Sequence, residues 1–413
     1  MIMPQYPVVT LLSPSHNLLT EHHGPRSQVA GSLPDTKPDY FLNPWRSYHP
    51  ASLSDAWLAY QRGAAIAPAP IKLAKSSHIS SLASVTDDAE LENEPLAGRK
   101  RRGYVRPEFS LWHEDDHEDD WRDPPVEVVA PRWDEEKEKS AVTWLGHAGV
   151  LIQIPWQRTS EAREDMCGVI YDPIFSYRCS PSQYVGPARY LDPPCTVSEL
   201  PSIHVCCISH DHCEDTSPTW LRIMLILRPQ DDHLDYYTIL DLWKYHQSTI
   251  HFFVPLGLKP WFTASGIPDT RVTELDWYHE AILSFPSPSS STPLVDGLPE
   301  PSFQYPPPEL PTSMIDQPAA LNMKIAFTPA QHRSGRGIFD HMTTLWGSWC
   351  VGVVENVDLA RASEVGMKGW QGFKVFFGGD TGYRYATAPE GDLDAICPAF
   401  RGMHDGLQFG PQN

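Results

Sequence analysis

The sequence predicts an α/β fold, and two observations lead to this prediction. From residue 140 onward, short runs rich in valine, isoleucine and aromatic residues recur between glycine- and proline-containing turns, as in β-strands. Residues 236–246 lie between two of these runs and space their apolar side chains as a helix does. Strands that alternate with helices are typical of an α/β core.

The predicted elements follow one another along the chain. Residues 141–145 and 150–154 are predicted as two strands joined by a small-residue turn, and 169–173 as a third strand. A fourth strand, 204–209, runs directly into a histidine cluster. After the helix, further strands are predicted at 252–255, 324–329, 345–354 and 374–377.

The composition divides the chain into two regions. Residues 1–135 mix proline, serine, histidine and charge blocks, so we expect a largely disordered N-terminal region. An aromatic Asn-Pro-Trp anchor at 40–48 either packs on the main domain or shares that disorder. The main domain is expected over 136–413, with insertions at 213–231 and 284–318; the second insertion is rich in proline and serine.

Charge and cysteine content restrict the partners and the compartment. Fifty-two Asp and Glu against 32 Lys and Arg give a net charge of -20, which argues against a nucleic-acid partner. The eight cysteines form no CxxC pair, so we expect reduced thiols in an intracellular protein. We recognise neither a signal peptide nor a membrane-spanning run, so the location expected is cytoplasmic or peripheral on a membrane.

The candidate site is a set of histidines and carboxylates that follow strands. His210 and His212 lie two residues apart at the end of a strand and can point at one metal ion, although this pair alone also fits a polar loop. His332 follows a second strand, and Asp380, in a Gly-Gly-Asp-Thr-Gly turn, follows a third. The glycines allow the backbone to pass close beneath an ion while Asp380 projects as a bridging ligand.

Several longer motifs resemble one enzyme family. They are TWLGHA at 143–148, DPIFS at 172–176, SPSQYVGP at 180–187, SELP at 198–201, VPLGL at 254–258, ELDW at 274–277 and LWGSW at 345–349. Together they resemble the N-acylphosphatidylethanolamine-hydrolysing phospholipase D family, a branch of the metallo-β-lactamase fold, in a fungal-type member. The resemblance runs from residue 143 to about residue 411, with Asn43-Pro44-Trp45 as an upstream match.

The resemblance implies a metallo-β-lactamase αββα sandwich with two zinc ions, which hydrolyses N-acylphosphatidylethanolamine to N-acylethanolamine and phosphatidic acid. The ligands implied are His210, His212, Asp232, His233, His332 and Asp380. Asp232 and Asp380 are the implied catalytic residues. Gln183, Tyr184 and Tyr236 match positions near the substrate, a membrane phospholipid, and a homodimer is possible.

The family motif HxHxDH is interrupted in this chain. Cys213, Glu214 and Asp215 follow His212, whereas the expected Asp-His pair appears only at Asp232 and His233. One hypothesis is that residues 214–230 translate an unspliced intron, because suitable codons at both ends can carry splice signals and joining them restores the motif. The alternative is a genuine insertion.

The C-terminal end also differs from the family pattern. We expect the sandwich to be incomplete there, because the strand and loop that would supply the last histidine ligand are missing. Two other interpretations therefore stay open. The chain is another metallo-β-lactamase-fold hydrolase, acting on a lactone or a different phosphodiester, or it is an inactive chain from a defective gene model.

Overall fold

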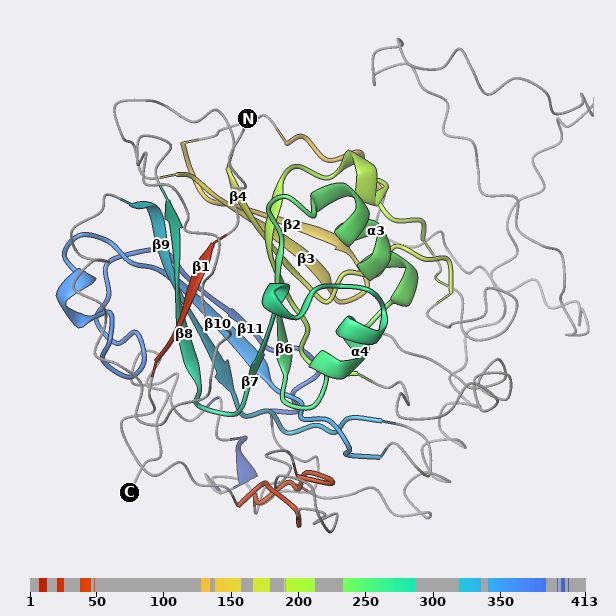
Figure 1. The fold of residues 1–413 in the computed structure, drawn as a ribbon, viewed down its shortest axis with the longest axis vertical. Coiled ribbons are helices and arrows are strands. Elements are labelled where there is room, and N and C mark those ends of the chain that lie inside the picture. Colours follow the sequence, from red (N-terminus) through yellow and green to blue (C-terminus); the bar gives the residue numbers. More distant parts are fainter. Residues whose placement is uncertain are drawn as a thin grey trace, which may run out of the picture. The chain divides into compact units, whose positions relative to one another are not determined.

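The fold contains two β-sheets, seen in a computed structural model of the chain (Figure 1). The structure describes residues 7–12, 21–25, 38–45, 48, 128–133, 138–156, 166–178, 189, 191–211, 233–286, 319–335, 341–383, 392, 395–397 and 400. Residues 1–50 and 128–413 form one compact unit. Residues 51–127 lie outside the described residues.

A six-stranded sheet has the order β2-β3-β4-β5-β6-β7. Its strands are β2 (Ala141–Gly146), β3 (Gly149–Ile154), β4 (Cys167–Tyr171), β5 (Ile203–Cys207), β6 (His251–Pro255) and β7 (Val272–Leu275). The first three are antiparallel neighbours, whereas β4 to β7 are parallel. The carboxyl ends of the parallel strands therefore meet at one edge, where sites in such sheets usually form.

A five-stranded sheet has the order β1-β8-β9-β10-β11. Its strands are β1 (Val8–Leu12), β8 (Glu280–Pro286), β9 (Ala319–Thr328), β10 (Ser348–Val353) and β11 (Lys374–Phe377). All neighbours are antiparallel, so β9 and β11, on either side of β10, run in the same direction. Trp349 of β10 pairs with both Phe327 and Phe377, which brings the ends of β9 and β11 to the same level.

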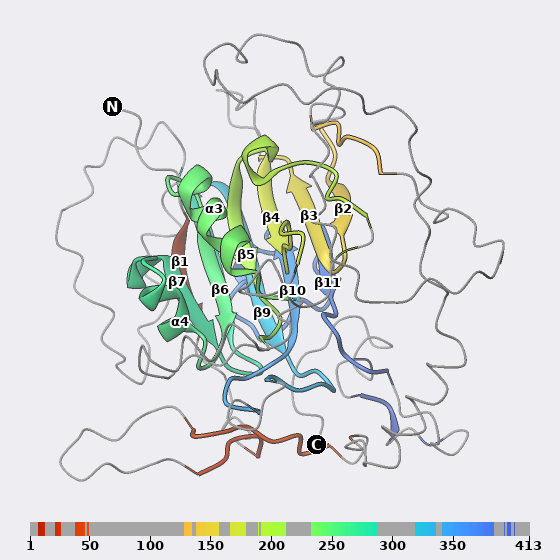
Figure 2. The same cartoon turned by 90° about the vertical axis from the view of Figure 1, so that its right-hand side faces the viewer.

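The helices α3 (Tyr236–His246) and α4 (Lys259–Ala264) cover the outer face of the six-stranded sheet (Figure 2). Side chains alternate in direction along β6, as a strand requires: Phe252 and Val254 pack against the helices. Phe253, between them, joins the core that the two sheets share. Short 3-10 turns complete the described elements at Val197–Glu199, Asp269–Arg271 and Leu359–Arg361.

The outer face of the five-stranded sheet is covered differently. Met367 and Trp370, from the segment after β10, pack there against Ala326 and Cys350. Among the described residues, the two sheets form a sandwich and both α-helices lie on the outer face of the six-stranded sheet, which is compatible with the α/β sandwich predicted. None of the described helices has the length and apolar character needed to cross a membrane.

Several predicted boundaries change. Val8–Leu12, within the region expected to be largely disordered, forms β1, which pairs with β8. β8 continues to Pro286, which places residues 284–286 in a strand and not in the predicted insertion. The predicted insertion at 213–231 and the C-terminal residues 401–413 lie outside the described residues.

Candidate metal centre

Four of the six predicted metal ligands lie within the described residues, and the fold brings them together. His210 follows β5 and His233 precedes α3, on the six-stranded sheet. His332 follows β9 and Asp380 follows β11, on the other sheet. The other two predicted ligands, His212 and Asp232, lie outside the described residues.

The ligand atoms lie close to one another. The Nε2 atoms of His210 and His332 are 3.0 Å apart. Asp380 lies between the two sheets' histidines: Oδ1 is 3.1 Å from Nε2 of His233, and Oδ2 is 4.0 Å from Nε2 of His332. Donor atoms bound to one tetrahedral zinc ion at 2.0–2.1 Å are about 3.3 Å apart, so the 3.0 Å and 3.1 Å separations are close to those of two ligands that share an ion. The two oxygens of Asp380 therefore face one histidine from each side, His233 and His332.

Asp172, directly after β4, contacts the histidine-bearing segments of the site through hydrogen bonds. Its buried carboxylate accepts hydrogen bonds from the Ser209 backbone N–H (2.7 Å) and the Ser209 hydroxyl (2.5 Å). The same carboxylate is 2.7 Å from Nδ1 of His233. Because all these groups donate to Asp172, we interpret it as a support for the ligands and not as a ligand itself.

These hydrogen bonds determine which nitrogen of each imidazole faces the other residues of the cluster. A carboxylate only accepts, so Nδ1 of His233 carries the proton that it donates to Asp172, and Nε2 faces Asp380. The Ser209 hydroxyl gives its proton to Asp172 and therefore accepts from Nδ1 of His210, 2.8 Å away. His210 likewise presents a lone pair on Nε2. The Nε2 atoms of His210 and His233 therefore face His332 and Asp380, respectively.

The charges at the site favour a cation. Burial lowers the pKa of His233, but hydrogen bonds and charge from Asp172 and Asp380 outweigh it and raise that pKa to about 10. The two carboxylates thus stabilise positive charge at His233. A divalent ion can replace the proton and satisfy the same carboxylates.

Backbone geometry at two positions makes the close approach possible. Gly379 has a φ of +56°, and a β-carbon there would lie 2.8 Å from the Ser209 β-carbon. A side chain at residue 379 would therefore push the Asp380 turn away from Ser209. Asp172 itself has a φ of +37°, an uncommon conformation for a non-glycine residue.

The loop that carries His332 is linked to the loop that carries His210. Asp211 is buried, its carbonyl accepts from the Gly335 N–H at 3.0 Å, and its carboxylate accepts from the Thr344 hydroxyl. The Gln331 backbone N–H donates to the Thr381 hydroxyl at 3.0 Å, which joins the His332 loop to the Asp380 turn. Hydrogen bonds therefore link the loops that carry His210, His332 and Asp380.

The remaining predicted residues are placed as follows. Tyr236, at the start of α3, is 40% exposed, and its ring packs edge to face on Trp261 and Tyr237. Gln183 and Tyr184 lie outside the described residues. His147 lies beside the site, with its ring centroid 5.7 Å from that of His233.

Sequence reasoning missed the supporting residues. Asp172 lies in a motif that resembles the family, yet nothing in its spacing indicates a role, and Ser209 is predicted only as the end of a strand. The one available signal was position, because both follow neighbouring parallel strands, and Tyr171 pairs with Cys207 in that register. Residues at such adjacent strand ends are expected to meet.

Comparisons with known proteins add a distant relationship. No family model matches the chain. An N-acyl-phosphatidylethanolamine-hydrolyzing phospholipase D 1 of Caenorhabditis elegans is 28% identical over 246 residues, 58% of this chain and 46% of that protein. Uncharacterized proteins of Mycobacterium tuberculosis and Mycobacterium bovis are 28% identical over 260 residues, 63% of this chain and 47% of theirs. The relationship is distant.

The chain spans about half the length of the curated relatives that it matches. The similarity to the nematode protein supports a distant relationship to the family that the sequence motifs resemble. The His and Asp groups at the strand ends can hold a metal ion. The relatives compared are bacterial and nematode proteins, so the fungal type stays a prediction.

Proposed function

We propose that the chain is a zinc-dependent phosphodiesterase of the metallo-β-lactamase fold, which hydrolyses N-acylphosphatidylethanolamine to N-acylethanolamine and phosphatidic acid. The observation that carries the proposal is the convergence of His210, His233, His332 and Asp380 from both sheets. The nematode relative supports the choice of substrate.

In this proposal the ligand residues divide between two zinc ions. His210 and His332, with Asp380, would hold one ion, and His233, with the other oxygen of Asp380, would contribute to the second. His212 would complete the first set and Asp232 the second. A pair of zinc ions would polarise a phosphodiester and lower the pKa of a water molecule.

The chain's own residues prepare the site for this chemistry. Asp172 keeps the proton of His233 on Nδ1, and Ser209 does the same for His210. Gly379 allows the Asp380 turn to approach. In the overall reaction, water adds to phosphorus, the phosphorus–oxygen bond to the ethanolamine breaks, and the leaving oxygen takes a proton. The phosphate stays on the diacylglycerol.

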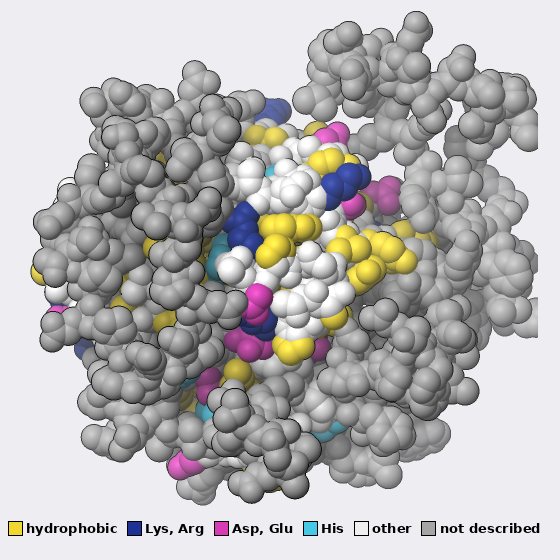
Figure 3. Space-filling model, in the orientation of Figure 1, with side chains coloured by type: hydrophobic (Ala, Val, Ile, Leu, Met, Phe, Trp, Pro, Cys, Tyr) yellow, Lys and Arg dark blue, Asp and Glu magenta, His cyan; other side chains and the backbone are white. Residues whose placement is uncertain are grey.

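The surface near α3 supports a membrane phospholipid as substrate. Tyr236, Tyr237 and Tyr245 of α3 are 40%, 44% and 47% exposed. Figure 3 shows hydrophobic and basic side chains next to one another on the described part of the face that carries α3 and α4. Aromatic and basic residues together suit the boundary between lipid and water. A peripheral location and a possible homodimer belong to the same proposal.

The test is product analysis with several substrates. The purified chain is incubated with N-acylphosphatidylethanolamine vesicles, a lactone and a simple phosphodiester, with chelator and after zinc is restored. Release of N-acylethanolamine that stops with chelator and returns with zinc supports the proposal. Turnover of only the lactone or the simple phosphodiester indicates a related hydrolase, and no turnover of any substrate by zinc-loaded protein indicates an inactive chain.

A further inference from the structure

The N-terminal segment, residues 21–25 and 38–45, is attached to the sandwich by a buried group that we call the histidine clasp. His22 and His23 each place Nε2 at 2.7 Å from one oxygen of the Asp276 carboxylate. The carboxylate only accepts, so both imidazoles donate to it. These hydrogen bonds work against the effect of burial and lower the pKa of Asp276.

Aromatic rings extend this attachment toward the second sheet. The His22 ring stacks on Trp277 with centroids 4.3 Å apart, and Trp45 also stacks on Trp277, at 5.5 Å. Trp277 in turn donates its indole N–H to the carbonyl of Trp346 at 2.6 Å. Phe41 is fully buried in the shared core. The segment is therefore packed as part of the domain.

The same segment contacts the loop that carries His332. The side-chain amide of Asn43 donates to the His332 carbonyl at 2.7 Å. The backbone N–H of Phe41 donates to the carbonyl of Met342 at 2.7 Å, and the N–H of Met342 donates to Ser334 at 3.0 Å. On its other side this loop is bonded to Asp211. The loop of His332 is thus held between the N-terminal segment and the loop of His210.

We infer that the N-terminal segment positions a ligand of the candidate metal site. Asn43 is a positioning residue for His332, and the histidine clasp holds Asn43 in place. The inference rests on the proposed function, because it takes His332 as a metal ligand. It adds that residues almost 300 positions earlier in the chain set the affinity of that ligand.

The clasp could itself be read as a metal site, since His22, His23 and Asp276 form a compact group. Its hydrogen bonds argue against this reading. Both Nε2 atoms already donate to the carboxylate, and Nδ1 of His23 is buried without a hydrogen-bond partner. A histidine that binds a metal usually donates its other N–H to a fixed acceptor. We therefore assign the clasp to docking.

The experiment compares Asn43→Asp, which keeps the shape but loses the donor, with the clasp variant His22→Ala/His23→Ala. Leu42→Ala is the matched control, because Leu42 is adjacent and 41% exposed. Two quantities are measured: zinc affinity by competition with a chromophoric chelator, and amide hydrogen exchange of residues 331–345 in the metal-free protein. Thermal unfolding of the metal-free protein checks that each variant folds.

We expect Asn43→Asp to weaken zinc binding about tenfold, at the lower end of the effect of removing a ligand's supporting hydrogen bond. Exchange in residues 331–345 should accelerate, with the unfolding temperature within about 4 °C of wild type, the shift expected from losing one hydrogen bond. The clasp variant should also bind zinc more weakly and exchange faster in residues 331–345. Leu42→Ala should show neither.

The outcomes separate this inference from the proposed function. Unchanged exchange of residues 331–345 in Asn43→Asp overturns the inference, whether or not the wild-type chain binds zinc. Unchanged exchange in the clasp variant overturns the docking role of the clasp, and loss of one full zinc ion from that variant makes the clasp a metal site. If the wild-type chain binds no zinc but the variants still exchange faster in residues 331–345, the proposed function is overturned, while the structural link between Asn43 and the His332 loop stands.

Discussion

Replacement of Asp172 by Asn tests how the site controls its histidines. The Asn side chain keeps the shape and one acceptor oxygen, which can still accept from the Ser209 N–H. It places an NH2 group where Oδ2 now accepts from the Ser209 hydroxyl and from His233. The NH2 group would then face Nδ1 of His233 as a donor, so that nitrogen must give up its proton and become an acceptor.

The proton then moves to Nε2 of His233, the atom that lies 3.1 Å from Asp380 and should bind the ion. We expect zinc affinity to fall about 10- to 100-fold, or roughly 1.4–2.8 kcal/mol. Each charge-assisted hydrogen bond that is lost also lowers stability, by about 1.5–3 kcal/mol. Near-ultraviolet circular dichroism therefore has to show first that the variant is folded.

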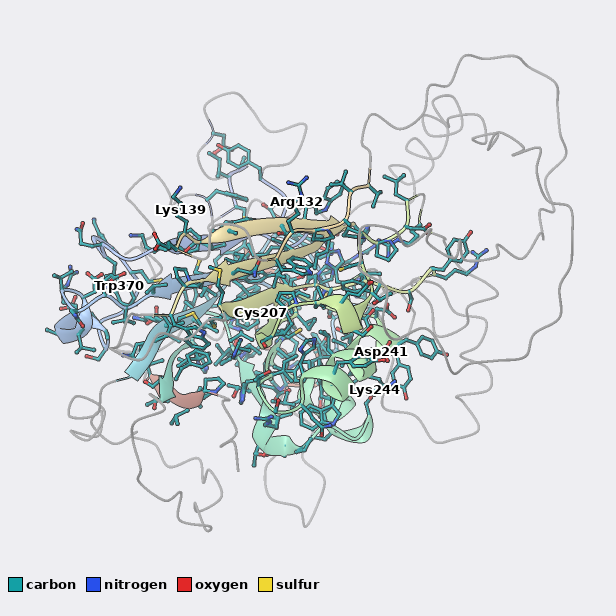
Figure 4. All side chains as sticks on the ribbon, turned by 90° about the horizontal axis from the view of Figure 1, so that it is seen from above. Arg132, Lys139, Cys207, Asp241, Lys244 and Trp370 are labelled. Carbon is teal, nitrogen blue, oxygen red and sulfur yellow. The ribbon has the colours of Figure 1, made fainter. Side chains whose placement is uncertain are left out.

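The assay is zinc titration by calorimetry or against a chelator at neutral pH. Asp241→Asn is the matched control, because it is the same chemical change at an exposed residue on the outer side of α3 (Figure 4). The control should bind zinc as the wild type does. A folded Asp172→Asn protein with wild-type zinc affinity would refute the role given to Asp172.

Three further predictions concern stability. Burial, together with the charges of Arg271 and Lys259, lowers the pKa of His251 to about 3, so below its unfolded pKa of about 6.5 only the unfolded chain takes up the proton. Urea unfolding in chelator should therefore show stability falling by up to about 1.4 kcal/mol per pH unit below pH 6.5, and His251→Phe should remove this loss; identical pH profiles would contradict it. Gly379→Ala should lower both stability, by about 1–2 kcal/mol, and zinc affinity. Gly266→Ala is the control, because Gly266 has φ +91° with open space around it, and it should lower stability without changing zinc affinity. Equal zinc affinities of the Gly379→Ala and Gly266→Ala variants would show that the close contact of residue 379 with Ser209 does not affect the site. Lys324→Met should cost about 3–5 kcal/mol in chemical unfolding, since it leaves buried Glu280 without its cation 2.7 Å away; a loss below about 1 kcal/mol would show that the pair is not needed.

Local patterns predicted much of the fold. The helix at 236–246 has the predicted bounds, because its apolar residues recur with helical spacing and the chain turns at both ends. The predicted strands at 204–209 and 374–377 also formed, each within two residues at either end. β1 was missed because its pairing with β8 joins residues far apart in sequence, and no local pattern encodes such a partner.

Local patterns also predicted part of the candidate site. His210, His332 and Asp380 could be named because each follows a recognisable strand, and the resemblance added His233. The roles of Asp172 and Asn43 could not be predicted, since each depends on a hydrogen bond to a distant residue. His212, Asp232, Gln183 and Tyr184 stay predictions. His251 is buried, and its Nε2 atom lies 2.8 Å from the Thr273 hydroxyl.

Burial also determines the chemistry of the cysteines. The cysteines that the structure describes are buried, namely Cys167, Cys195, Cys206, Cys207, Cys350 and Cys397. Burial raises the pKa of the Cys206 thiol, and the charge of Asp172 raises it further. Such thiols pack as small apolar side chains and have little reactivity.

The zinc content of the purified chain tests the central claim most directly. Elemental analysis is made after dialysis against metal-free buffer, on the wild type and on a His332→Ala/Asp380→Ala variant. The account predicts about two zinc ions per wild-type chain and a clear loss in the variant. Near-zero zinc in a folded wild-type chain, or equal zinc in both proteins, would contradict it.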